Sequence, residues 1–339
     1  MGVDPNRLDE TVRTFYRNRS VLVTGGAGFA GSHVVEALVS IGARVRVPVR
    51  ESSSLDFLDR VIDDVEIVQA DLFDATDAHR AIDGQDVVLH LAAAKGGGIT
   101  HSMQHHGSLF RGNMLAAIQV LDAARDADVE RFVAVSSACV YPRDSQAPTP
   151  EEDGVKDAPE PTNAGYGWSK RMVEFLSAAY REEFGLNVGI VRPFNLYGPR
   201  DDFFRPSNHV IPGIVTRLFG GERPLSVWGS GQQTRSFLYV EDMVRGVLMA
   251  GARTDVEGPL NLGSDEEVTI ADLARLIVEL SGIDTDVVLD PTKPDGQPRR
   301  ACDTSRAKAE LGFAATTPLR DGMAKTLAWY LHAREAVAV

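Results

Sequence analysis

The chain has 339 residues, of which 43% are hydrophobic and 24% charged, and its formal net charge at pH 7 is −13. These values are typical of a globular protein, and the acidic balance argues against a surface that binds nucleic acid. The two cysteines are too few for a disulfide framework and lie in no metal-ligand spacing, so we expect a cytoplasmic protein without a metal. No stretch has the length of a membrane span, and the polar residues 1–18 predict a short N-terminal arm.

A glycine-rich turn follows the first predicted strand, Ser20–Thr24. Its glycines have the spacing of a dinucleotide-binding turn, which needs a tight bend, room for a pyrophosphate and close packing of a helix on the sheet. An apolar helix pattern follows over about residues 31–41, and the start of that helix offers N–H groups to phosphates. The residues expected to bind the cofactor here are Gly25, Gly28, Phe29, Ala30 and Gly31.

The end of the second predicted strand, Arg44–Val49, bears on the choice of cofactor. Sites of this type usually carry an acidic residue there for the adenosine ribose, but this chain has Val49, followed by Arg50, Glu51 and three serines. Arg50 and the serines are suited to a 2′-phosphate, which favours NADP. The alternative is that Arg50 is a solvated charge and Glu51 binds the ribose, which leaves NAD as the second choice.

Three further strands are expected at Val65–Gln69, 86–90 and 131–136. Asp71 and Leu72 follow the first of them, where Asp71 is placed to meet the adenine amino group. The small residues after the second let the cofactor lie against the backbone, and the candidates there are Leu91, Ala92, Ala93 and Lys95. A helix is expected over 109–127. This alternation predicts an α/β fold built on a Rossmann-type, doubly wound parallel sheet.

Residues that can carry chemistry follow the strand at 131–136. Ser137 comes directly after it and Cys139 two residues later, whereas Tyr166 and Lys170 lie four residues apart on one face of the next predicted helix. A lysine ammonium beside a tyrosine is expected to lower the pKa of the phenol, which would make it a usable acid or base nearer neutral pH.

The glycine turn, Ser137 and the Tyr166–Lys170 pair resemble the extended short-chain dehydrogenase/reductase family, and within it the enzymes that act on nucleotide-sugars. The resemblance covers about residues 19–330. Segments 93–99, 206–212 and 293–299 are similar to the epimerase–reductases of the GDP-fucose synthase group. Segments 136–139 and 233–237 also resemble GDP-mannose 3,5-epimerases.

The resemblance implies a 4-keto-6-deoxy nucleotide-sugar as substrate, with GDP as the first choice of nucleotide. Cys139 and His209 match the acid/base positions for epimerisation at carbons 3 and 5. Tyr166 would give the proton for reduction by NADPH, Ser137 would bond the carbon-4 oxygen, and Lys170 would hold the cofactor ribose. The alternatives are that Cys139 is a small packed residue and that His209 has a purely structural role.

The resemblance also implies a smaller, discontinuous C-terminal α/β lobe that binds the substrate. We expect the cofactor domain over 19–192 plus 236–262 and the substrate lobe over 193–235 plus 263–335. Substrate contacts are expected from Asn195, Arg217, Trp228, Arg235 and Arg299, with Pro193 and Asn195 near the cofactor. The alternative for any one of these arginines is that it forms an ion pair at the surface and does not bind the substrate.

Ala138 and Cys139 stand where family dehydratases and decarboxylases carry a carboxylate, so neither activity is expected. A 3,5-epimerase, a carbon-4 reductase, another nucleotide or sugar (heptoses included) and an idle NADP-binding regulatory protein remain alternatives. The family further implies a homodimer in which helices near 109–127 and 166–182 pair into a four-helix bundle.

Overall fold

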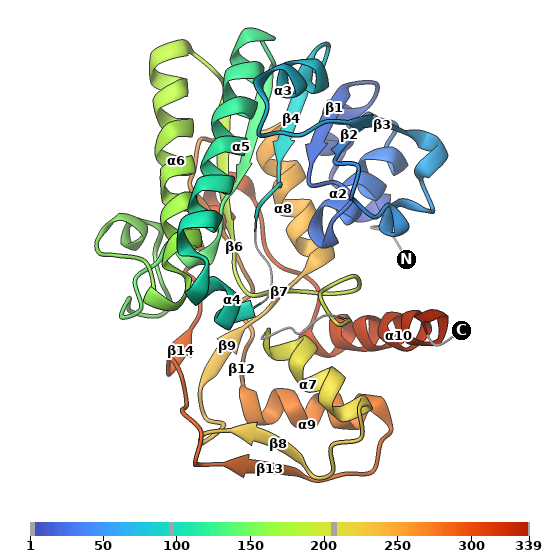
Figure 1. The fold of residues 1–339 in the computed structure, drawn as a ribbon, viewed down its shortest axis with the longest axis vertical. Coiled ribbons are helices and arrows are strands. Elements are labelled where there is room, and N and C mark those ends of the chain that lie inside the picture. Colours follow the sequence, from blue (N-terminus) through green and yellow to red (C-terminus); the bar gives the residue numbers. More distant parts are fainter. Residues whose placement is uncertain (1–3, 95–97, 205–208, 338–339) are drawn as a thin grey trace.

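A parallel sheet forms the larger part of the molecule in the computed structural model, which describes residues 4–94, 98–204 and 209–337 (Figure 1). Its seven strands are ordered β11–β6–β5–β4–β1–β2–β3, and every neighbouring pair is parallel. In chain order they are β1 (Ser20–Thr24), β2 (Arg44–Val49), β3 (Val65–Gln69), β4 (Val87–His90), β5 (Arg131–Val135), β6 (Val188–Pro193) and β11 (Leu260–Leu262). The predicted doubly wound α/β fold is therefore confirmed.

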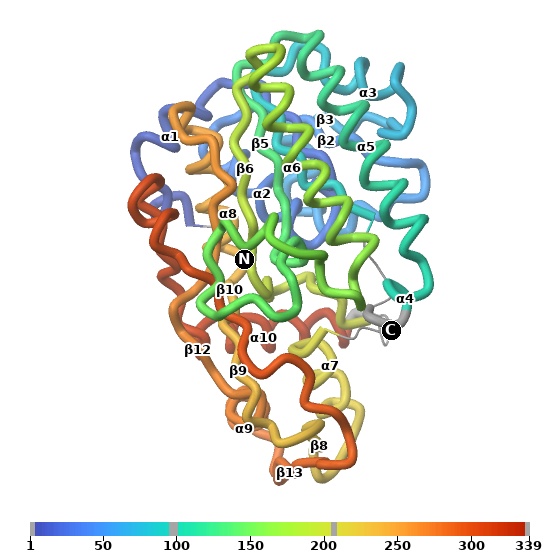
Figure 2. The backbone as a smooth tube through the Cα atoms, turned by 90° about the vertical axis from the view of Figure 1, so that its left-hand side faces the viewer, coloured from blue at the N-terminus to red at the C-terminus, as the bar shows by residue number. Residues whose placement is uncertain are grey.

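Helices cover both faces of this sheet because the strands are apolar on both sides. Val21 and Val23 of β1 pack in one core with α1 (Glu10–Tyr16), α2 (Phe29–Ser40) and α8 (Val240–Ala252). Leu22, between them, packs in a second core with α3 (Ala75–Ile82), α5 (His106–Asp126) and α6 (Ala164–Phe184). Figure 2 shows α5 and α6 side by side along one flank of the molecule, in agreement with their contacts.

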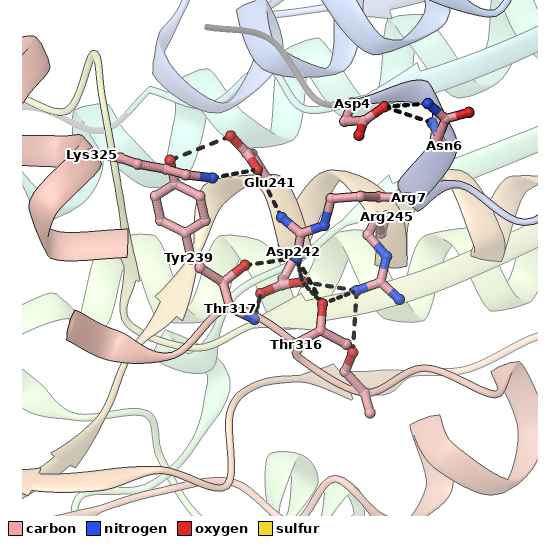
Figure 3. A network of polar contacts seen from close by, with 11 residues as sticks. Asp4, Asn6, Arg7, Tyr239, Glu241, Asp242, Arg245, Thr316, Thr317 and Lys325 are labelled. Atoms are coloured by element: carbon pink, nitrogen blue, oxygen red, sulfur yellow. Dashed lines mark hydrogen bonds and ion pairs between the residues drawn. The ribbon is translucent and has the colours of Figure 1, made fainter. Parts of the chain in front are cut away.

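The described N-terminal residues, 4–18, pack against this lobe. Tyr16 of α1 is wholly buried, and its hydroxyl donates to the Leu248 carbonyl oxygen at 3.2 Å. Arg7 donates to Glu241 of α8 at 2.9 Å and to Thr317 at 2.9 Å, within the polar network of Figure 3. These bonds connect Tyr16 and Arg7 to α8 and to the segment before α10 (Leu319–Val337).

Asp242 lies at the centre of that network. Burial alone would raise the pKa of its carboxyl, but hydrogen bonds from Thr317, Thr316 and Arg245 outweigh burial and hold it below its usual value. The carboxylate is therefore charged and fully satisfied, which is the condition for burying a charge inside a stable fold.

A second group of elements lies beyond the carboxyl ends of the large sheet, at the lower end of Figure 1. β9 (Thr234–Ser236) pairs with β12 (Glu267–Thr269) and β14 (Arg299–Arg300), and β8 (Leu225–Trp228) pairs with β13 (Val287–Asp290). The helices here are α7 (Val210–Phe219) and α9 (Ile270–Ser281). Within the segment 236–262 expected in the cofactor domain, β10 (Leu238–Tyr239) pairs with β7 (Leu196–Tyr197) in a separate small sheet.

Candidate active site

The candidate site residues gather at one edge of the large sheet. Since all seven strands are parallel, their carboxyl ends meet there, and the chain turns away in opposite directions from β1 and β4. Gly25, Asp71, Leu91 and Ser137 directly follow or lie within two residues of the ends of β1, β3, β4 and β5. Ligands of open α/β sheets bind at such a switch point.

The glycine turn after β1 is shaped for close backbone contacts. Gly25 has φ +70°, and a Cβ there would lie 3.0 Å from the backbone of Ala92. A Cβ on Gly31 would lie 2.1 Å from the Gly25 carbonyl oxygen, so only glycine fits. Gly28 precedes α2 without a side-chain cap, and Phe29 and Ala30 begin the helix half-buried. The first N–H groups of α2 are therefore available to an anion, as a pyrophosphate requires.

The residues beyond β2 and β3 form the expected adenosine end of the cofactor site. Ser53 Oγ accepts from the Arg50 N–H at 3.1 Å, and the resulting turn leaves the Arg50 side chain exposed. Asp71 is exposed after β3, and its Oδ1 accepts from the Phe73 N–H at 3.1 Å, while Leu72 is half-buried. This arrangement fits a cofactor with a 2′-phosphate beside Arg50. Glu51 is exposed too and keeps the alternative open.

The segment after β4 is held by buried polar groups that sequence reasoning missed. The Ala92 N–H donates to Thr24 Oγ1 at 3.0 Å, and the same hydroxyl lies 3.0 Å from His90 Nδ1. Burial, together with the charge of Lys170, lowers the pKa of His90 to about 3, so the ring is neutral. The sequence does contain a signal for this contact, because a polar residue, Thr24 or His90, ends each of two neighbouring apolar strands.

This segment also receives support from α5. Asn113 Oδ1 accepts from the Ala94 N–H at 2.7 Å, and its Nδ2 donates to the Ala94 carbonyl oxygen at 3.2 Å. Leu91 and Ala92 are half-buried and Ala93 is exposed, whereas Lys95 lies outside the described residues.

Ser137, Tyr166 and Lys170 come together at the end of β5. Ser137 Oγ accepts from the Cys139 N–H at 3.2 Å and is hydrogen-bonded to Tyr166. Lys170 Nζ donates to the Val135 carbonyl oxygen at 2.8 Å and lies 5.8 Å from the centre of the Tyr166 ring. Both Tyr166 and Lys170 are buried.

The predicted lowering of the Tyr166 pKa is wrong for the chain in this state. Burial raises the pKa of the phenol above its usual value, and the nearby Cys139 thiol adds to the rise. The hydrogen bond with Ser137 opposes both effects without outweighing them. Desolvation has the largest effect because a buried phenolate loses the water that would hydrate its charge. Tyr166 is consequently a protonated group at neutral pH, which is the form that can give a proton away.

Cys139 and His209 occupy different elements. Cys139 is half-buried in the turn of Ala138–Val140, whereas Cys302 is buried in a small core with Tyr141 and Phe194. His209 stands directly before α7 with its side chain 44% exposed, and its Nδ1 lies 3.7 Å from Asp201 Oδ1.

A buried ion pair, which the sequence pattern did not indicate, supports the turn that carries Ser137 and Cys139. Arg192 of β6 donates to Glu174 of α6 at 2.8 and 2.6 Å and to the Tyr141 hydroxyl at 2.8 Å. Ser136 donates to the same Glu174 carboxylate. Residues on both sides of Ser137 and Cys139 are therefore fixed to β6 and α6.

The three candidate arginines of the small lobe differ in how well neighbouring carboxylates neutralise their charge. Arg217 Nη1 lies 3.0 Å from Glu222, and Arg299 pairs with Glu267 at 2.5 Å. Arg235, by contrast, is half-buried, and its guanidinium donates to the Thr234 carbonyl oxygen at 2.7 Å.

Arg300 is a further residue that the sequence analysis did not select. It pairs in register with Arg235 across β14 and β9. Burial, together with the charge of Arg300, lowers the pKa of Arg235 to about 10, which Glu160 only partly opposes. These two guanidinium groups on neighbouring strands share the charge of Glu160, whose carboxylate lies 3.8 Å from Arg300, and together they leave an excess of positive charge.

The remaining candidates are Asn195, Pro193 and Trp228. Asn195 adopts φ +40°, and its Nδ2 donates to the Ser236 carbonyl oxygen at 2.8 Å, directly beside Arg235 in the chain. Pro193 is half-buried at the end of β6. Trp228 is 57% exposed at the end of β8, and Lys293 Nζ lies 5.8 Å from the centre of its ring.

Across residues 4–94, 98–204 and 209–337, no three His, Cys, Asp or Glu side chains are grouped so as to hold a metal ion. Within the same ranges, no helix combines the length and the apolar character needed to cross a membrane.

Comparison with known proteins places these features in context. The family model described as NAD dependent epimerase/dehydratase family matches residues 21–263. The dTDP-4-dehydro-6-deoxy-D-allose reductase of Streptomyces bikiniensis is 34% identical, over 94% of this chain and 98% of its own. The probable GDP-L-fucose synthase 1 of Oryza sativa subsp. japonica is 33% identical over 92% of each chain. The epimerase Mth375 of Methanothermobacter thermautotrophicus superposes with a TM-score of 0.85 at 29% identity, covering 97% of this chain and 96% of that one.

Proposed function

The chain belongs to the NAD dependent epimerase/dehydratase family and is an NAD(P)-dependent enzyme of nucleotide-sugar chemistry, and we propose that it converts a 4-keto-6-deoxy nucleotide-sugar. It epimerises the sugar at carbon 3, carbon 5 or both and then reduces carbon 4 with NADPH. The observation that carries this proposal is the cluster of Ser137, Cys139, Tyr166 and Lys170 at the end of β5.

Reduction needs a hydride at carbon 4 and a proton on the oxygen of that carbon. NADPH supplies the hydride when it is bound. Tyr166, which is protonated at neutral pH, gives the proton, and Ser137 bonds the same oxygen. Lys170 holds the cofactor ribose, and its ammonium charge stabilises the phenolate after the proton has left.

Epimerisation uses the ketone before it is reduced. A carbonyl at carbon 4 acidifies the hydrogens on carbons 3 and 5, so a base can remove one as a proton and an acid can return a proton to the opposite face. Cys139 and His209 take these two roles. A thiolate and an imidazole are both able to exchange protons near neutral pH.

We assign the substrate diphosphate to the excess positive charge on β9 and β14. Arg235 and Arg300 are paired in register, and guanidinium groups bind diphosphate oxygens in a bidentate way. Arg217, Asn195 and Trp228 are assigned to the rest of the nucleotide-sugar. Arg299 is a weaker candidate, since Glu267 already engages two of its nitrogens. In this proposal the substrate lobe comprises 193–235 and 263–335.

A reductase that does not epimerise is the second candidate. The observation that favours it is the Streptomyces relative, whose name describes a reductase of a dTDP-linked 4-dehydro-6-deoxy sugar. The GDP-linked substrate is the first choice because the rice relative is named for GDP-L-fucose and because the motifs quoted above resemble that group.

The test incubates the protein in heavy water with GDP-4-keto-6-deoxymannose or its dTDP counterpart, with NADPH or NADH. NADPH oxidation together with deuterium at carbon 3 or 5 is the expected result, and Cys139→Ser should suppress the deuterium incorporation. Tyr166→Phe should reduce NADPH oxidation by about 10²- to 10⁴-fold, the usual contribution of a general acid. Oxidation without deuterium would establish the second candidate, and exchange without oxidation would establish an epimerase instead.

Arg300→Ala and Arg299→Ala form a matched pair for the diphosphate assignment. The first should raise KM with little change in kcat, because a contact equal in the ground and transition states affects binding alone. The second should change KM much less, and equal effects would contradict the assignment.

We also propose a cytoplasmic homodimer in which α5 and α6 form a four-helix bundle. Phe175 of α6 is 69% exposed and Phe184 is 44% exposed, which is more apolar surface than a helix facing water needs. Sedimentation of the wild type and of Phe175→Glu tests the dimer. A wild-type mass of 36.7 kDa, that of one chain, at micromolar concentration would contradict it.

A further inference from the structure

The segment 198–203 is held in place by α2, the helix at the cofactor turn. Arg200, in the left-handed region at φ +71°, donates to Ser32 Oγ at 3.1 Å and forms an ion pair with Glu36. His33 Nε2 lies 3.0 Å from the Pro199 carbonyl oxygen. All of these side chains are buried, so the segment has one defined position relative to α2.

The same segment is held on its other side by α10. The ring of Phe203 lies 5.9 Å from that of Trp329 and 5.2 Å from that of Tyr330, measured between ring centres. Asp201 stands between the two anchors, and it is buried. The backbone that carries this carboxylate is therefore held by contacts on both α2 and α10.

The surroundings of the Asp201 carboxylate are incomplete. Oδ1 accepts from the Asp202 N–H at 2.8 Å and lies 3.7 Å from His209 Nδ1. Oδ2 is buried and has no hydrogen-bond partner among the described residues. Burial of a carboxylate with so few partners is costly, and a positive charge on the facing imidazole would reduce that cost.

We propose that Asp201 is a positioning residue for His209 in the epimerisation step. Its carboxylate accepts from Nδ1–H of the imidazole and stabilises the imidazolium that forms when His209 takes a proton. Nε2 is then the nitrogen that exchanges the proton with the sugar, as in other dyads in which a carboxylate orients a histidine. The 3.7 Å separation shortens to a hydrogen bond when substrate fills the site. This inference rests on the proposed function, in which His209 is an acid or base.

The charge of Asp201 is tested by Asp201→Asn, which keeps an oxygen for the Asp202 N–H. Deuterium incorporation from heavy water should fall by about 10²-fold, comparable to the loss of acid–base assistance. NADPH oxidation with a 4-keto sugar that needs no epimerisation should be unchanged, as should the Kd for NADPH. Asp202→Asn is the matched control, because it removes the same charge from the neighbouring residue, and it should leave incorporation unchanged.

A double-mutant cycle separates positioning from a structural role. In a His209→Asn background, Asp201→Asn should cause no further loss of incorporation, whereas a merely structural residue would cause the same loss in both backgrounds. Nitrogen NMR of ¹⁵N-histidine wild type, with the His209 signals assigned from His209→Asn, gives a measurement that needs no Asp201 variant. It should show Nδ1 protonated in the neutral ring.

The possible results distinguish an error in the role of Asp201 from an error in the role of His209. Normal incorporation in Asp201→Asn, additive losses in the cycle or an Nε2–H tautomer would overturn the role of Asp201 alone. If the wild type incorporates no deuterium, or if His209→Asn incorporates it normally, the assignment of His209 in the proposed function is wrong and this inference fails with it.

Discussion

Acidification should destabilise the protein through His33, the histidine of α2 that faces the segment 198–203. Its side chain is 1% exposed, and burial lowers its pKa from 6.5 to about 4. The charge of Arg200 contributes to this decrease, while the hydrogen bond with the Pro199 carbonyl oxygen opposes it. A proton on His33 would place two buried positive charges side by side.

The direction in which pH changes the stability follows from the pKa values of His33 in the unfolded and folded chain. The unfolded chain binds a proton at this histidine near pH 6.5, whereas the folded chain binds it only near pH 4. Stability from the neutral ring is therefore complete above pH 6.5 and falls as the pH falls toward 4. Between pH 7.5 and pH 5, the free energy of unfolding should fall by about 2 kcal/mol through this residue.

Urea unfolding of the wild type and His33→Gln at both pH values isolates this effect, since the carboxylates common to both proteins cancel. The wild type should lose about 2 kcal/mol more than the variant on acidification. His79 is a control of opposite sign, because its hydrogen bond with Asp126 raises its pKa, so His79→Gln should lose more stability than the wild type. Equal losses in the wild type and His33→Gln would refute the reasoning.

Two further predictions concern the glycine turn and the buried ion pair. Gly31→Ala, whose Cβ would lie 2.1 Å from the Gly25 carbonyl oxygen, should abolish measurable NADPH binding in a fluorescence titration, and unchanged affinity would show that the turn is not the pyrophosphate site. Glu174→Gln should lower the free energy of unfolding by about 3–5 kcal/mol, because it leaves Arg192 buried without its partner. The exposed pair of Glu279 and Arg320 sets the comparison, since Glu279→Gln should cost about 1 kcal/mol or less and a similar loss in both variants would contradict the role of burial.

The sequence by itself determined the sheet and the cofactor turn. The apolar runs at Ser20–Thr24, Arg44–Val49 and Val65–Gln69 have the same bounds in the structure as in the prediction. Strands and glycine turns depend on side-chain pattern and backbone freedom over a few residues, which are local properties. The resemblance to the family also depended on local motifs, and the family model confirms it over residues 21–263.

Tertiary structure alone decided which polar groups meet and in what environment. Asp201 and His209 are near in the chain, but Thr24 and His90, Arg192 and Glu174, and Arg235 and Arg300 are brought together only by strand order and helix packing. The Tyr166 pKa shows the same limit, since the helical spacing to Lys170 predicted a decrease and burial produced an increase. Desolvation depends on every group that excludes water from a site, and most of those groups lie far away in the sequence.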